Sequence, residues 1–147
     1  MRISAKGEYA IKAMVDLALH DGRDLQPIQD IAARQGIPQR YLEQVLLQLK
    51  RSGFLYARRG SAGGYRLSRP ADQITVGALL RAVDGPPPGP DSSRRGGRPG
   101  SEDAAGLAEL WQEIAGAVAS VVDRTTLEDL RRRAEERRSA VRPMYHI

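Results

Sequence analysis

The chain has 147 residues, no cysteine and two histidines, and its composition is 41% hydrophobic and 28% charged. This length fits one compact domain with an accessory element, and the missing cysteines exclude disulfides, thiol nucleophiles and cysteine-ligated clusters. No apolar run approaches the roughly 20 residues of a membrane span, and the first residues lack the apolar core of a signal peptide. We therefore expect a cytoplasmic protein.

The net charge of +5 is unevenly distributed. Residues 1–85 carry 13 Lys and Arg against 8 Asp and Glu, whereas residues 86–147 carry 10 of each. This asymmetry is expected if the first part meets a polyanion such as nucleic acid. A charge of this size also occurs in soluble proteins that have no such partner.

The first half predicts three short helices. Residues 5–20 carry an apolar stripe of helical period, and a polar loop at 21–24 closes that helix. Pro27 suits the first turn of a second helix, with Ile28, Ile31 and Ala32 on its core face, and Gly36 ends it. Pro38 opens a third helix that reaches residue 51, with an inward stripe of Tyr41, Leu42, Val45, Leu46 and Leu49.

A β-hairpin is predicted next, because residues 54–59 and 65–68 have period-two patterning around a glycine-rich tip at 60–64. A short helix over 75–83 follows. The run 85–103 is rich in proline and glycine and predicts a flexible loop. Residues 104–122 predict an amphipathic helix, and Thr126–Asp129 resembles the capped start of another short helix. The predicted organisation is a DNA-binding domain at 1–84, the loop at 85–103, a dimerisation helix and short helix at 104–140, and a tail at 141–147.

Two short helices with a tight turn, followed by a hairpin, indicate a winged helix-turn-helix, a mainly α fold with a small β-wing. A helix fits the major groove, so we expect 38–51 to read DNA there. Its remaining faces carry Gln39, Arg40, Glu43, Gln44 and Lys50. Arg58 and Arg59 precede the wing tip and suit phosphate or a narrow minor groove. Helix pairs are also common in all-α proteins, and arginines beside glycine turns are often simply solvated.

The helix at 104–122 has a wide apolar stripe that one small domain seldom buries. A second subunit is the economical partner, so we expect a homodimer. The alternative is that the stripe packs on its own N-terminal domain. The predicted dimerisation residues are Leu107, Leu110, Trp111, Ile114, Val118, Val121 and Val122.

Several segments resemble the Rrf-type winged-helix regulators, the family of IscR, NsrR and CymR. They are MRISAKGEYAIKAMVDLAL, DIAARQGIPQRYLEQVLLQLKRSG and ARRGSAGGYRLSRP. The resemblance implies a homodimer with crossing long helices, a roughly palindromic operator, base reading by Arg40, Glu43 and Gln44, and minor-groove entry by Arg59 and the wing. It extends the candidate DNA contacts to Arg2, Ser4, Gln29, Pro38, Tyr41, Gly60, Ser61, Gly63, Gly64 and Tyr65.

One departure from the family concerns the cofactor. Cluster-binding members place three cysteines in the loop that matches 85–103, where this chain has only Ser92, Ser93 and Ser101. Some members also place a histidine near the start of the long helix, and it is missing here. Glu8 matches a carboxylate ligand of some members, but alone it cannot hold a cluster. We therefore expect no cofactor and no metal.

The segment ELWQEIAGAVASVVDRTTLEDL and the tail are most similar to the CymR branch. That resemblance implies a repressor of cysteine and sulfur metabolism that senses through the enzyme cysteine synthase. Tyr145, His146 and Ile147 are candidates for binding that partner, because a terminal isoleucine carboxylate can enter an amino-acid carboxylate site. The alternative is a frayed tail.

Other functions remain open at this point. A family member without a cluster could control another regulon through a small-molecule effector, and the long helix could belong to a pure interaction module. An enzyme has little support, because His20 and His146 are far apart and no Ser-His-Asp group, phosphate loop or metal spacing is present. We expect His20 to be a surface residue at a helix C-terminus.

Overall fold

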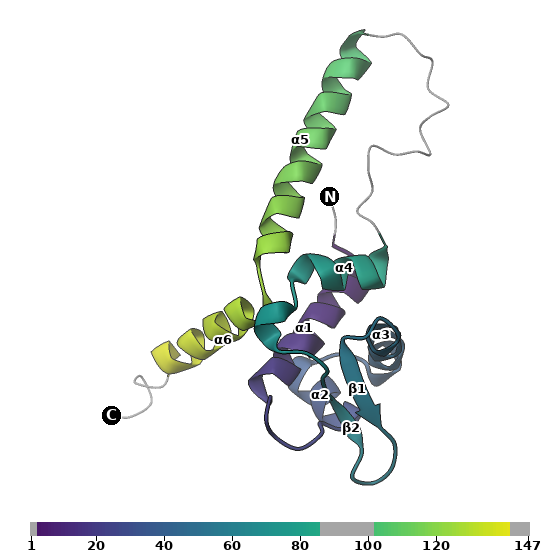
Figure 1. The fold of residues 1–147 in the computed structure, drawn as a ribbon, viewed down its shortest axis with the longest axis vertical. Coiled ribbons are helices and arrows are strands. Elements are labelled where there is room, and N and C mark those ends of the chain that lie inside the picture. Colours follow the sequence, from purple (N-terminus) through teal and green to yellow (C-terminus); the bar gives the residue numbers. More distant parts are fainter. Residues whose placement is uncertain (1–2, 86–101, 142–147) are drawn as a thin grey trace.

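The structure is a computed structural model that describes residues 3–85 and 102–141 (Figure 1). Its elements in chain order are α1 (Ala5–Leu19), α2 (Ile28–Gln35), α3 (Gln39–Arg51), β1 (Leu55–Arg58), β2 (Gly64–Leu67), the 3-10 turn η1 (Ala71–Gln73), α4 (Val76–Asp84), α5 (Glu102–Arg124) and α6 (Leu127–Val141). This is the mainly helical fold with a small β-wing that the sequence predicts. In these two ranges no helix is long and apolar enough to span a lipid bilayer.

The turn between α2 and α3 follows from two residues. Gly36 has a φ of +63°, and its backbone N–H donates to the Ala32 carbonyl to close α2. Glycine adopts this left-handed conformation without the steric penalty of a Cβ. Pro38 is extended and precedes the first turn of α3, where its missing N–H has no consequence. The predicted end of one helix at Gly36 and start of the next at Pro38 are confirmed.

The hairpin is antiparallel, with Leu55 opposite Leu67 and Arg58 opposite Gly64. Leu55 and Leu67 are buried, so one face of the hairpin packs on the helices. A third segment joins the sheet, because the backbones of Gln26 and Tyr65 exchange two hydrogen bonds of 2.9 Å each. The sequence did not predict this pairing, which attaches the hairpin to the loop between α1 and α2.

The core lies between α1, α3, α4 and the base of the hairpin. Its fully buried large side chains include Met14, Ile31, Leu42, Leu46, Leu49, Ile74, Leu79 and Leu127. The predicted placement of Tyr41 in the inward stripe is wrong, because its side chain is 61% exposed. Leu42, Val45, Leu46 and Leu49 already fill the inward face of α3, and Tyr41 lies at the edge of this face, where its ring meets Tyr9.

The C-terminal helices leave this core in two directions. In Figure 1, α5 (green) rises away from the N-terminal elements and α6 (yellow) runs off to one side. The turn between them is tied to the start of α4, since Val76 donates to the Thr125 carbonyl and Leu127 donates to the Ile74 carbonyl, both at 2.9 Å. α6 has 15 residues and is longer than the predicted short helix. Residues 86–101 of the predicted loop and the tail 142–147 lie outside the described residues, and α5 begins at Glu102.

Candidate nucleic-acid interface

The solvent face of α3 presents the predicted base-reading residues together. Gln39, Arg40, Glu43 and Gln44 are exposed; Arg40 and Gln44 lie on the side of the helix opposite the buried Leu42, Val45, Leu46 and Leu49, and Gln39 and Glu43 flank this buried stripe. Lys50 is exposed in the last turn. Arginine and glutamine can donate bidentate hydrogen bonds to guanine and adenine edges, and a glutamate can accept from cytosine. This face therefore has the chemistry that reading a major groove needs.

The wing beside α3 ends in a cationic tip. Arg58 and Arg59 are exposed, and the tip that follows turns through Gly60, which has a φ of +110°. The N–H of Gly63 donates to the Gly60 carbonyl at 3.0 Å and closes this turn, leaving Ser61 exposed. A narrow, cationic tip of this kind suits the phosphate edge of a duplex.

Tyr65 lies at the base of the wing, in β2, and packs against the hydrophobic core. Its side chain is half-buried, and this burial, with a smaller contribution from the negative charge of Glu43, raises the pKa of its phenol. Tyr65 therefore stays neutral at physiological pH. α3 contacts β1 of the hairpin, so the two candidate DNA-contacting elements are adjacent.

The remaining candidates lie in different places. Gln29 and Pro38 are exposed, and Gly63 and Gly64 are half-buried under the tip. The hydroxyl of Ser4 accepts from the Gly7 N–H at 2.9 Å and donates to the Asp84 carboxylate at 2.6 Å, which docks the start of α1 on α4. A DNA contact by Ser4 stays a prediction, and Arg2 lies outside the described residues.

Leu47 is a candidate that the sequence reasoning missed. Its side chain is 45% exposed, and it follows Glu43 and Gln44 by one turn on the same face of α3. An apolar side chain at such a place can contact the methyl group of thymine. Its position one helical turn after Glu43 could have identified Leu47 as part of the exposed face. A leucine within an amphipathic helix is, however, usually assigned to the core.

The expectation for His20 is wrong in one part. The residue does end α1, but its side chain is 18% exposed and it is not a free surface group. Its Nδ1 lies 2.7 Å from the carbonyl oxygen of Asp16, one turn earlier in the helix.

The donor set does not fit a cysteine-ligated iron–sulfur cluster. The chain has no cysteine, and among the side chains that the structure describes, in residues 3–85 and 106–141, no three His, Asp or Glu gather as metal ligands. Glu8 is exposed, and its carboxylate lies 3.5 Å from the Lys12 ammonium one turn along α1. This contact is an ordinary i,i+4 ion pair on a helix surface.

Comparison with known proteins agrees with this geometry. Residues 3–133 match the protein family described as "Rrf2: Iron-dependent Transcriptional regulator". The chain is 38% identical over 132 residues to the HTH-type transcriptional regulator IscR of Sodalis glossinidius, covering 88% of this chain and 78% of that protein. It is 37% identical over 130 residues to an HTH-type transcriptional regulator of Mycobacterium tuberculosis, covering 88% and 81%.

Solved structures show the same fold. CymR, described as the global cysteine regulator of B. subtilis, is 36% identical with a TM-score of 0.76, over 89% of this chain and 96% of that one. IscR of T. potens is 31% identical with a TM-score of 0.74, over 92% and 90%. These relatives are transcription regulators, which agrees with the expectation that this chain is not an enzyme. The exposed polar face of α3 and the adjoining wing agree with these matches, and the family match over residues 3–133 shows that the chain belongs to the Rrf2 family of winged-helix, DNA-binding transcriptional regulators.

Proposed function

We propose that this chain is a homodimeric, sequence-specific repressor that works without an iron–sulfur cluster. The observation that carries the proposal is the exposed polar face of α3 beside the cationic tip of the wing. A recognition helix and an adjacent wing can contact the major groove and the neighbouring minor groove of one duplex.

The roles on DNA follow from the side-chain chemistry. Arg40 would pair with a guanine edge, Gln44 with adenine, and Glu43 would accept a hydrogen bond from cytosine. Arg59 would enter the minor groove or bind a phosphate, which supplies affinity that depends on salt. Base contacts from α3 thus set which DNA sequence is recognised, and contacts from the wing set the position of the protein on the duplex and the strength of binding.

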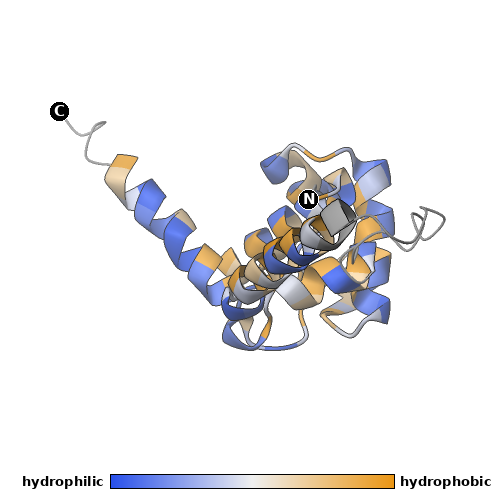
Figure 2. Ribbon diagram, turned by 90° about the horizontal axis from the view of Figure 1, so that it is seen from above, coloured by the Kyte–Doolittle hydropathy of each residue, from blue (hydrophilic) through white to orange (hydrophobic). Residues whose placement is uncertain are grey.

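The second copy in the dimer would bind along α5. Leu107, Leu110, Trp111, Ile114 and Val121 are between 36% and 53% exposed, and Val118 and Val122 are half-buried. In Figure 2, α6, which runs toward the C-terminus, is largely hydrophilic, whereas α5 carries hydrophobic segments. The exposed fractions of the α5 side chains show that the N-terminal elements leave them uncovered. A contiguous apolar face of this kind is rare on a monomer, and the same face of a second copy is complementary to it by two-fold symmetry. Two reading helices related in this way would match a palindromic operator.

The chemistry of the chain favours regulation without a cluster. The family is described as iron-dependent, but cysteine thiolates are the usual ligands of iron–sulfur clusters and this chain has none. Its similarity to the B. subtilis cysteine regulator supports control of cysteine and sulfur metabolism. Cysteine synthase is then the proposed partner, with the terminal residues Tyr145, His146 and Ile147 as its binding segment. Deleting Ile147 should abolish binding to cysteine synthase, and unchanged binding would remove the tail from the mechanism.

A second candidate is regulation of another regulon by a small-molecule effector. A cavity of about 500 Å³ lies between the loop after α1 and the hairpin, with His20, Asp21, Tyr56 and Arg66 among its lining residues. Ligand sites are commonly of this size. Genome-wide binding maps with and without O-acetylserine separate the two, because only the sulfur-metabolism proposal predicts sites at cysteine genes that change with this compound.

DNA reading is tested with a duplex that the wild-type protein selects from a random-sequence pool. Arg59→Ala should weaken binding by about 1–3 kcal/mol if Arg59 makes a specific contact. Arg138→Ala is the matched control, because Arg138 is exposed at the far end of α6. Equal affinities for the two variants would remove Arg59 from the interface, and failure of the wild type to enrich any duplex would overturn the proposed function.

The dimer is tested by sedimentation. Trp111→Glu places a charge in the apolar face of α5 and should yield monomers, whereas Gln112→Glu adds a charge at the next, off-stripe position and should leave dimers intact. A wild-type chain that sediments as a monomer at micromolar concentration would refute this part of the proposal.

A further inference from the structure

Asp16 of α1 is a charged group inside the core. Its side chain is 1% exposed, and it is the one polar side chain that is fully buried among residues 3–85 and 106–141, the residues whose burial the structure describes. Moving a carboxylate out of water is unfavourable unless it is paired and hydrogen-bonded. A buried charge at this position therefore needs partners that the fold must supply.

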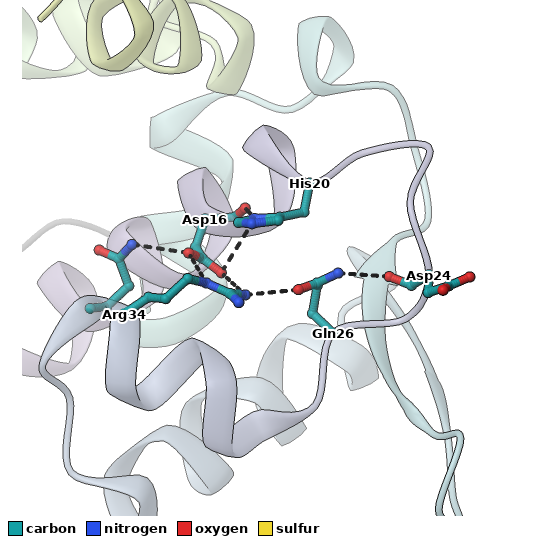
Figure 3. Close-up of polar contacts among 6 residues, drawn as sticks. Asp16, His20, Asp24, Gln26 and Arg34 are labelled. Atoms are coloured by element: carbon teal, nitrogen blue, oxygen red, sulfur yellow. Dashed lines mark hydrogen bonds and ion pairs between the residues drawn. The ribbon is translucent and has the colours of Figure 1, made fainter. Parts of the chain in front are cut away.

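Arg34 and Gln35 of α2 provide those partners (Figure 3). The Arg34 Nε and Nη2 donate to the two Asp16 carboxylate oxygens at 2.9 and 2.8 Å, and the Gln35 Nε2 donates to Oδ1 at 3.1 Å. This two-pronged geometry is the strongest form of an arginine–carboxylate pair. The hydrogen bonds to Asp16 raise the pKa of the Arg34 guanidinium, so Arg34 stays charged.

The chain of hydrogen bonds continues to the wing. The same Arg34 Nη2 donates to the Gln26 Oε1 at 2.9 Å, and the Gln26 Nε2 donates to the Asp24 carbonyl at 2.8 Å. The backbone of Gln26 is the segment that pairs with Tyr65 of β2. Figure 3 shows Arg34 joined by dashed contacts to Asp16 of α1 and to Gln26 of this loop. The side chain and backbone of Gln26 thus connect the buried carboxylate to the hairpin.

A hairpin of two four-residue strands is marginal by itself, so its orientation depends on how it is attached. A buried ion pair adds little net stability compared with apolar side chains of the same volume, and its better-attested use is to specify one geometry. An ion pair of this kind, joined through Gln26 to the segment that holds the hairpin, is suited to fixing the angle between the hairpin and α3.

We propose that Asp16, Arg34 and Gln26 are positioning residues for DNA binding, which hold the wing at the angle to α3 at which both contact one duplex. This inference rests on the proposed reading of DNA by α3 and the wing. The three residues touch no DNA themselves. They act through Tyr65, and through it on the cationic tip at Arg58 and Arg59.

The test uses the full chain and the duplex selected by the wild type. Gln26→Leu cuts the outer link and leaves the Asp16–Arg34 pair intact, which keeps the core folded. Arg34→Lys keeps the charge but loses the two-pronged geometry. Arg131→Lys is the matched control, because Arg131 makes the same kind of paired contact with Glu128 within α6. The first two variants should weaken binding about tenfold, the size of one specific contact, and the control should not.

Two readouts separate positioning from general stability. The loss in Gln26→Leu should be much less than additive with the loss in Arg59→Ala, because both act through the wing. The Tyr65 amide should exchange its hydrogen faster in Gln26→Leu and Arg34→Lys than in Arg131→Lys. Wild-type affinity in both variants, full additivity with Arg59→Ala, or unchanged Tyr65 exchange would overturn the proposal. If the wild type selects no duplex, the proposed function fails, and the exchange measurement still decides whether the tether exists.

Discussion

Thr126 and Asp129 cap the first turn of α6 reciprocally. The Asp129 N–H donates to the Thr126 hydroxyl at 3.1 Å, and the Thr126 N–H donates to the Asp129 carboxylate at 3.0 Å. Both N–H groups lie at a helix start, where the helix itself supplies no acceptor. The short turn between α5 and α6 is therefore fixed by its own side chains, and with it the place where α5 leaves the N-terminal half.

Removing the Thr126 hydroxyl should destabilise this turn. Thr126→Ala leaves the Asp129 N–H without its acceptor, so the free energy of unfolding should fall by about 1 kcal/mol. Urea denaturation monitored by circular dichroism measures this change. Thr126→Ser retains the hydroxyl and should restore most of the loss. An unchanged midpoint in Thr126→Ala would show that water replaces the cap without a penalty.

Acid should weaken the same cap. The backbone and hydroxyl hydrogen bonds from Thr126, followed by the nearby Arg132 and Arg133, lower the pKa of Asp129. The folded pKa is thus below the unfolded value of about 3.9, so the contribution is fully present above that pH. It is lost as the pH falls through the lower folded pKa.

Melting temperatures between pH 3 and pH 7 test whether the stabilising contribution of Asp129 is lost as the pH falls. Asp129→Asn keeps an acceptor oxygen but has no charge to titrate. It should melt below the wild type at neutral pH, and the difference should shrink at pH 3. A difference that stays constant across this range would exclude the titration of Asp129 as its cause. Glu128 and Asp123, whose pKa values are lowered mainly by Arg131 and Arg81, add to the wild-type slope in the same direction.

Leu127 should be essential for attaching α6. Its side chain is 0% exposed and belongs to the core that α1 and α4 form. Leu127→Ala leaves a cavity there and should reduce the free energy of unfolding by about 2–5 kcal/mol. Leu47→Ala is the matched control, and because Leu47 is largely exposed, its change should stay within about 0.5 kcal/mol. Similar losses for the two variants would mean that the site of Leu127 collapses without a void.

The sequence predicted elements whose signals are local. Gly36 and Pro38 fix the turn between α2 and α3 through their own backbone preferences, and the Thr126 cap needs only residues three apart. The solvent face of α3 followed from helical periodicity. The edges of this face could not be predicted from periodicity, because Tyr41 and Leu47 are apolar residues that the packing of neighbouring elements leaves outside the core.

The tertiary pairings could not be predicted from one sequence. Asp16 and Arg34 are 18 residues apart, and nothing in the pattern around either residue indicates that a carboxylate is buried there. Gln26 lies in a polar loop whose sequence suggests solvent exposure, yet its backbone is hydrogen-bonded to Tyr65, 39 positions later in the chain. The DNA contacts of the predicted residues stay predictions, which the experiments above address.

Gly64 shows how such a pairing constrains a single residue. Glycines at the hairpin tip are expected from turn geometry, but Gly64 is the first residue of β2 and has a φ of +152°. A Cβ at this position would overlap the backbone of Gln26 and the nitrogen of Pro27. These are main-chain atoms that cannot rotate away, so the loop after α1 would have to shift.

Gly64→Ala should therefore separate the hairpin from that loop. We expect a loss of about 1–3 kcal/mol in the free energy of unfolding, from backbone strain and the displaced Gln26–Tyr65 pairing. Gly116→Ala is the control, since nothing lies near a Cβ there and alanine favours a helix over glycine by about 1 kcal/mol. Urea denaturation compares the two, and the Tyr65 amide should exchange faster in Gly64→Ala alone. If Gly64→Ala is as stable as the wild type with a protected Tyr65 amide, the close approach of the two backbones does not exist in solution.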